Sequence, residues 1–178
     1  MTQASISMYD ASIPTLIDML GNMKAWLDKG AAQKSGADLV NARLVEDMRP
    51  LSFQIQAASD SAKNGAARLA GIPMPSMPDT ETSIAELKAR CDKTIAFLKT
   101  ITPEQLEGSE TRNVELRFPS GHGYDLTGLD YLTKFMIPNF FFHVQSAYAI
   151  LRAQGVEIGK PDYLAHMGPP NVVPAEPA

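Results

Sequence analysis

The sequence predicts a mostly helical domain of the all-α class. Two observations carry this prediction: apolar residues recur at steps of three and four along four long segments, and alternation at every second residue is confined to residues 113–127. The chain has 178 residues, of which 44% are hydrophobic and 20% charged, and this is enough for one domain with its own core. We therefore expect four main helices and a small β-hairpin before the fourth.

The first helix is predicted from an apolar stripe with Pro14 near its start, a position that proline favours. The pattern is broken at Lys29-Gly30 and again at Ser35-Gly36. A shorter stretch from Asp38 to Asp47 is expected to add a turn or two of helix. The residues of the stripe are Tyr9, Ile13, Leu16, Leu20, Met23 and Leu27.

A proline-rich segment separates the second and third helices. The second stripe ends before Gly71, which has the position of a C-cap, and consists of Leu51, Ile55, Ala58, Ala62, Ala66 and Leu69. Residues 72–80 carry three prolines and cannot continue a helix, so we expect a long crossover there. Ser83 and Glu86 have capping-box spacing. The third stripe follows directly, with Ile84, Leu87, Cys91, Ile95 and Leu98.

The last helix follows the hairpin. Residues 120–123, with glycines on both sides of His122, supply the hairpin turn, and we expect His122 to be exposed at its tip. The fourth helix should run from about Gly128 to Gln154. Pro138 lies inside it and cannot donate to the carbonyl group four residues earlier, so we expect a kink.

His143 is the main candidate for a functional residue, because its helical phase places it with Leu132, Met136, Phe140, Ala147 and Ile150 on a face that we expect to be interior. Asn139 lies one turn earlier on the same side. Asp47 and Gln54 are seven residues apart and face one way. We hypothesise that Asp47, Gln54, Asn139 and His143 converge on one ligand pocket. The alternative is that Asp47 pairs locally and Gln54 lies on the surface.

Composition narrows the classes of function. The net charge of −4, without a basic stripe, argues against nucleic acid as a partner. The single cysteine, Cys91, excludes an internal disulfide and a cysteine-pair metal motif. No targeting segment and no long apolar run is present, so we expect a cytoplasmic protein without membrane contact. Neither a paired nucleophile nor a glycine-rich phosphate loop appears.

Several segments resemble an uncharacterised bacterial domain-of-unknown-function family in the DinB/YfiT-like superfamily. The similar segments are residues 41–51, 59–71, 142–152 and 155–163, and the likeness covers the chain to about residue 164. The resemblance implies a DinB-like four-helix bundle with a long crossover between its second and third helices, usually as a homodimer. We therefore expect one domain over residues 1–164 and a proline-rich tail over 165–178, which contains His166.

The superfamily often holds a divalent metal with three histidines, one on the second helix and two, four residues apart, on the last. Here His143 matches one position of the last pair, but Asn139 and Ala147 stand on either side and the second helix has no histidine. One imidazole with amides and a carboxylate is a weak donor set for zinc or nickel. We therefore expect no resident metal or other cofactor, with weak zinc or nickel binding as the alternative.

Three functions follow from these observations. The first, which we favour, is binding of an unknown small molecule in an interior pocket near His143, where a metal site has degenerated. The second is a divalent-metal-dependent enzyme, a thiol-dependent transferase or hydrolase-like. The third is a homodimeric interaction protein without a small-molecule site. Whether the protein is an enzyme, and which residues would be catalytic, stays open at this point.

Overall fold

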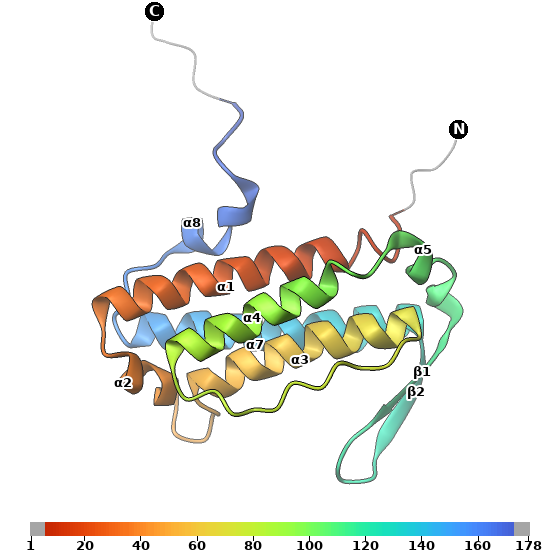
Figure 1. The fold of residues 1–178 in the computed structure, drawn as a ribbon, viewed down its shortest axis with the longest axis horizontal. Coiled ribbons are helices and arrows are strands. Elements are labelled where there is room, and N and C mark those ends of the chain that lie inside the picture. Colours follow the sequence, from red (N-terminus) through yellow and green to blue (C-terminus); the bar gives the residue numbers. More distant parts are fainter. Residues whose placement is uncertain (1–5, 173–178) are drawn as a thin grey trace, which may run out of the picture.

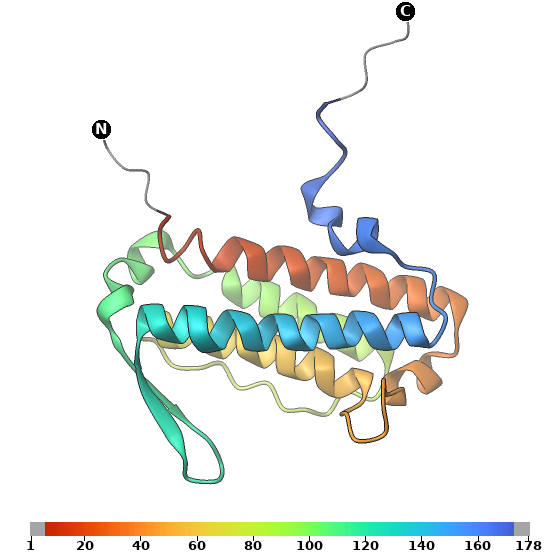
Figure 2. The same cartoon turned by 180° about the vertical axis from the view of Figure 1, so that it is seen from behind.

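The computed structural model describes residues 6–172, and four long helices form its core (Figures 1 and 2). They are α1 (Ile13–Gln33), α3 (Leu51–Ala70), α4 (Ile84–Leu98) and α7 (Ile137–Ala153). Helices α1 and α3 each pack against both α4 and α7, so they lie diagonally across the bundle. The predicted helical bundle with a hairpin before its last long helix is confirmed. Within residues 6–172, no helix has the length and apolar character needed to cross a membrane.

Helix α1 begins next to Pro14, as predicted, but it continues through Gly30. A Cβ atom on Gly30 would lie 3.1 Å from Leu39 Cδ1, so the missing side chain lets α2 (Gly36–Asn41) pack closely on α1. The predicted break at Lys29-Gly30 is therefore wrong, whereas the break near Ser35 is confirmed. Helix α2 ends at Asn41, and the expected helix as far as Asp47 is replaced by a loop.

Helix α3 ends at Gly71, whose φ of 67° is the left-handed conformation of a C-cap. The predicted crossover follows and runs alongside α3 without helix or strand (Figure 1). It leads to α4, where Ser83 Oγ accepts from the Glu86 N–H and Glu86 Oε2 accepts from the Ser83 N–H. The predicted C-cap, crossover and capping box are thus confirmed.

A buried arginine attaches the crossover to the bundle. Arg90 on α4 is only 2% exposed, and its guanidinium nitrogens lie 2.7 Å from Asp60 Oδ1 on α3. They also lie 2.9 Å from Asp79 Oδ1 and 3.0 Å from Glu81 Oε1, both on the crossover. We call these four residues the arginine clamp. Because the clamp joins α3, α4 and the crossover, it determines where Asp79 lies.

The hairpin and the short segments before it occupy one end of the bundle. Helix α5 (Pro103–Leu106) begins with a proline directly after its N-cap Thr102, and a 3₁₀ turn (Ser109–Thr111) leads into the strands. Strands β1 (Asn113–Arg117) and β2 (Gly123–Thr127) pair antiparallel. The hairpin projects from the bundle, as Figure 1 shows, and its inward-facing side chains Val114 and Leu116 are buried.

The last long helix has a widened first half. A short α6 (Gly128–Asp130) passes into a π-helix over Tyr131–Met136 and then into α7. The Ile137 N–H donates to the carbonyl of Leu132, five residues earlier. Pro138 cannot donate and its ring crowds the preceding turn, which is a physical reason for the wider turn just before it. The expected disturbance at Pro138 therefore takes the form of a π-helix.

After Gly155 the chain folds back over α1. Residues 160–167, which we call the C-terminal strap, comprise α8 (Lys160–Tyr163) and a 3₁₀ turn (Ala165–Met167). Trp26 Nε1 donates to the carbonyl of Asp162 at 3.0 Å, and the Trp26 and Tyr163 rings stack with centroids 5.3 Å apart. Part of the predicted tail, residues 173–178, lies outside the described residues.

Candidate functional site

His143 lies on α7 and is hydrogen-bonded to α3. Its Nδ1 lies 2.8 Å from Gln54 Oε1, and Gln54 is 2% exposed, so Gln54 is not a surface residue. Gln54 Nε2 donates to the carbonyl of Arg49 at 3.0 Å, which assigns the amide orientation and makes Oε1 an acceptor. Nδ1 of His143 must therefore be the donor. The neutral ring then carries its lone pair on Nε2.

The His143 ring lies at the border of the bundle rather than in its interior. The residues of α7 that are fully buried near it are Phe140, Val144 and Ala147, and His143 itself is half-buried. His143 was expected to face the interior, but the structure places its side chain a fraction of a helical turn away, at the edge of the buried face. Burial lowers the pKa of His143, which favours the neutral form. Within residues 6–172, Nε2 forms no hydrogen bond and is not a buried atom, so it is open to solvent.

Asn139 forms a second bond between the same two helices. Its Nδ2 donates to Ser61 Oγ at 2.6 Å, and Ser61 Oγ donates to the carbonyl of Ala57. A third bond joins Arg68 to Tyr131, whose hydroxyl accepts from the guanidinium at 3.3 Å. Polar side chains therefore link α3 to α7 and to the π-helix before it.

We call the pairs Gln54–His143, Ser61–Asn139 and Arg68–Tyr131 the polar seam. Its three α3 members are seven residues apart, close to two helical turns, so they share one face. Sequence analysis identified Gln54, Asn139 and His143 but missed the other three. Continuing the seven-residue step from Gln54 would have found Ser61 and Arg68, whereas the position of Tyr131 depends on the π-helix.

Asp47 takes no part in the polar seam. It lies exposed in the turn between α2 and α3, and it makes no side-chain hydrogen bond or ion pair with the described part of the chain. The structure thus joins Gln54 to His143, and it joins Asn139, one turn earlier on α7, to Ser61. Asp47 belongs to neither pair.

A groove runs beside the polar seam and has a volume of about 250 Å³. We call it the α3–α7 groove, and its α3 side consists of Phe53, Gln56, Ala57, Asp60, Ser61, Asn64 and Arg68. The remaining walls are Asp79 of the crossover, Leu116 of β1, and Tyr131, Phe135 and Asn139 before and in α7. The edge of the His143 ring packs on Phe53, with ring centroids 6.0 Å apart, so the groove borders His143.

The side chains present do not fit the three-histidine metal site of the superfamily. No three His, Cys, Asp or Glu side chains gather closely enough to hold a metal ion anywhere in residues 6–172. The histidines lie in separate places: His122 is exposed in the hairpin turn, and His166 bonds to Asn22 on α1. Across the seam His143 faces Gln54, an amide that binds zinc and nickel weakly.

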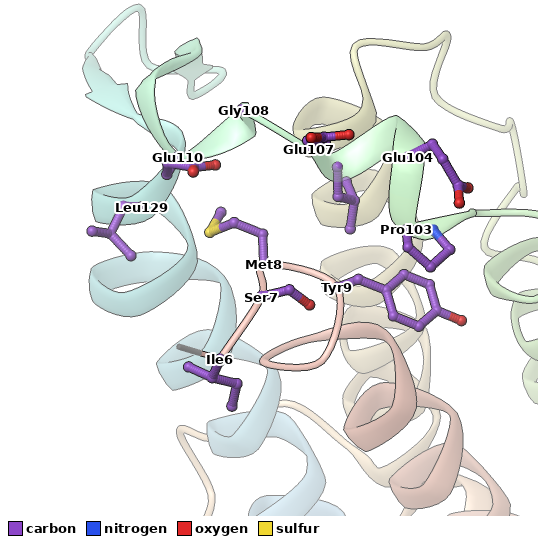
Figure 3. Close-up of a pocket in the computed structure, with 11 residues that line it drawn as sticks. Ile6, Ser7, Met8, Tyr9, Pro103, Glu104, Glu107, Gly108, Glu110 and Leu129 are labelled. Atoms are coloured by element: carbon purple, nitrogen blue, oxygen red, sulfur yellow. The ribbon is translucent and has the colours of Figure 1, made fainter. Parts of the chain in front are cut away.

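A larger cavity of about 590 Å³ lies at the end of the bundle where the hairpin projects (Figure 3). The N-terminal residues Ile6 and Met8 line it together with Leu129 and the loop around α5. Its charged residues are Glu104, Glu107 and Glu110, and all three are exposed to solvent. Because these carboxylates are solvated and no cation of residues 6–172 pairs with them, we place the candidate site in the α3–α7 groove.

Comparison with family models and with solved structures gives matches. The family model described as "Domain of unknown function (DUF1993)" matches residues 8–164. The structure is similar to the crystal structure of a DinB family member protein from Shewanella denitrificans, with 34% sequence identity and a TM-score of 0.82. That similarity covers 94% of this chain and 95% of the other. Among curated proteins there is no match.

Proposed function

Because the chain belongs to the DUF1993 family and has a DinB-like fold, as its sequence resemblance led us to expect, we propose that it binds a small molecule in the α3–α7 groove beside His143. The observation that carries the proposal is that polar and aromatic side chains from four separate segments converge on this groove. Binding sites commonly combine apolar walls with a few placed polar groups.

Several polar atoms at the groove are available to a ligand. Asn139 Nδ2 donates to Ser61 Oγ, and Asn139 Oδ1 accepts no hydrogen bond from residues 6–172. At the border with Phe53, His143 Nε2 is an open acceptor. The volume of about 250 Å³ is below the roughly 300–1,000 Å³ of typical ligand pockets, so the proposed ligand is small.

The proposal includes a metal site that has degenerated. His143 stands where the superfamily resemblance expects one ligand of a three-histidine set, and it now donates from Nδ1 to an amide oxygen. A histidine with this bond can orient a polar ligand group through Nε2 without a metal. No step of the proposed binding depends on a bound ion.

Thermal unfolding with and without probe compounds tests the proposal. Suitable probes are thioglycerol, cysteamine, phenylacetate and phenylacetamide, which cover thiols, an acid and a neutral amide. A probe at 100 times its dissociation constant adds about 2.7 kcal/mol to stability, or roughly 5–10 °C in Tm for a chain of this size. Ala57→Phe fills the groove and should abolish the shift, because Ala57 lines it and is only half-buried.

The matched control is Ala96→Phe, the same substitution at an exposed position on α4. This variant should keep the full ligand-induced shift of the wild type. If no probe changes the Tm, or if Ala57→Phe responds to the probes as the wild type does, the proposed site is wrong.

A further inference from the structure

Arg68 is the one positively charged residue among those that line the groove, and no carboxylate of residues 6–172 pairs with it. It is half-buried in the last turn of α3, with its guanidinium 5.9 Å from the centroid of the Tyr131 ring. Within residues 6–172 it forms no ion pair. The other buried or paired arginines differ: Arg90 contacts three carboxylates, and Arg117 contacts two.

A second hydrogen-bond donor lies beside Arg68. Asn64 lies one turn earlier and lines the same groove. Its Oδ1 accepts from Lys63 Nζ at 3.0 Å, and its N–H groups donate to no residue of the described part of the chain. Tyr131 is only 1% exposed, and its hydroxyl oxygen accepts from Arg68, which holds the guanidinium at this end of the groove. This end of the groove therefore offers a guanidinium and an amide as donors.

The acidic residues of the groove are engaged elsewhere. Asp60 is two turns of α3 away from Arg68, and its carboxylate is bound by Arg90 and Lys63. Asp79 is held by the arginine clamp. Neither carboxylate is paired with Arg68, so the groove has an uncompensated cation at one end and carboxylates at the other.

From this arrangement we propose that the ligand carries a single carboxylate, which Arg68 binds at the Tyr131 end of the α3–α7 groove. The proposal rests on the proposed function and specifies its ligand class. The planar guanidinium matches a carboxylate with two parallel hydrogen bonds. Phosphate is less suitable, because its second negative charge would meet one cation in a groove that also contains Asp60 and Asp79.

The walls next to Arg68 indicate what the carboxylate is attached to. Tyr131 and Phe135 stack with centroids 5.9 Å apart, and the buried side chain of Leu116 completes this part of the groove. These surfaces favour an aromatic or aliphatic body over a sugar. The structure assigns the site to a small monocarboxylic acid with an apolar body.

Titration followed by two-dimensional NMR of the full chain tests this assignment. The probes are phenylacetate, 3-phenylpropionate, their two primary amides and inorganic phosphate. We expect the acids to shift the Arg68 side-chain and Asn139 amide resonances. The acids should also bind at least about tenfold more tightly than the amides, because a hydrogen bond between charged groups changes the dissociation constant by at least about that factor. Phosphate should bind more weakly than the acids.

Variants separate ligand binding from a structural role, because an arginine in the last turn also favours the helix by itself. Arg68→Gln should weaken binding of the acids by at least about tenfold and leave the amides unchanged, and Arg68→Lys should keep part of the affinity. Arg152→Gln removes the last-turn arginine of α7, outside the groove, and should bind like the wild type. Thermal unfolding of each variant confirms that it is folded.

The outcomes distinguish this inference from the proposed function. If acids and amides bind equally at the groove, or if Arg68→Gln has no effect on the acids, the carboxylate assignment is wrong while the small-molecule site stands. Tighter binding of phosphate than of either acid would also overturn the assignment. If no probe shifts a groove resonance, both this inference and the proposed function fail.

Discussion

Replacing Arg90 by methionine should destabilise the protein strongly at neutral pH. The substitution removes the cation of the arginine clamp and leaves three carboxylates. Removing one partner of a buried ion pair costs about 3–5 kcal/mol. The side chains of Asp60 and Asp79 are 37% and 51% exposed, so water can solvate them after the change. Glu81, at 13% exposure, should account for most of the loss.

We therefore expect Arg90→Met to lower the free energy of unfolding by about 3 kcal/mol, the low end of the range for buried pairs. For a chain of this length the loss corresponds to a decrease in Tm of roughly 6–12 °C. Arg90→Lys keeps the charge but not the forked geometry, so its free energy of unfolding should lie between those of the wild type and Arg90→Met. Urea unfolding followed by circular dichroism measures each difference.

The pH dependence shows whether charge is the cause. Burial raises the pKa of Glu81, but hydrogen bonds from Gln56 and Arg90 more than offset it, so the pKa lies below its ordinary value. In the wild type this contribution to stability is present above the pKa of the unfolded chain and is lost as the pH falls through the lower folded value. In Arg90→Met the Glu81 carboxylate has lost its cation, so protonation at low pH removes the cost of its unpaired negative charge. The stability difference should shrink below about pH 4.

A stability difference that stays constant from pH 7 to acid would refute this reasoning, because lost packing of the arginine stem does not depend on pH. The double variant Arg90→Met with Glu81→Gln provides a second test. Removing the unpaired carboxylate should recover part of the stability at neutral pH, as expected for two directly coupled residues. No recovery would mean that Glu81 is not the group destabilised.

Three further predictions concern the metal, His143 and Cys91. Protein purified without a histidine tag should contain well below one equivalent of zinc or nickel by elemental analysis, and a full equivalent that is lost in His143→Ala would contradict the proposed degenerate site. Burial lowers the pKa of His143 from 6.5, so the unfolded chain binds more protons there, and the free energy of unfolding should fall as the pH drops through about 6.5. His143→Gln should flatten this part of the plot of unfolding free energy against pH, and an unchanged slope would show that His143 is not the group responsible. Burial raises the pKa of Cys91 to about 12, so a thiol reagent should label it only after urea unfolding, and rapid labelling of the native protein would be inconsistent with the structure.

The parts of the fold that could be predicted from sequence are those with local causes. Apolar residues at steps of three and four located the long helices, and Gly71 and the Ser83–Glu86 capping box marked ends that the structure confirms. The helix break predicted at Gly30 was wrong, because this glycine is explained by a contact with another helix: its missing side chain makes room for Leu39. A glycine needed for close packing looks in sequence like one that breaks a helix.

The candidate site could be predicted less well from the sequence than the fold, for two physical reasons. Steps of three and of four are both compatible with a helical face, so the pattern could not decide between His143 and its buried neighbour Val144. The groove walls come from α3, the crossover, the hairpin, the π-helix and α7, and only tertiary packing brings Asp79 and Leu116 together. The link between Arg68 and Tyr131 depends in addition on the π-helix.

The π-helix over Tyr131–Met136 also affects how the chain would respond to a change in its length. A π turn contains about one residue more than an α turn, so deleting one residue in this segment could restore regular α geometry. Such a deletion would leave the residues before it in nearly the same phase relative to α7, because the wider turn already absorbs the extra residue. Tyr131 would then still face Arg68, and His143 and Asn139 would keep their places. A one-residue deletion within the regular turns of α7, by contrast, would rotate everything before it by about 100° and turn Tyr131 away from Arg68.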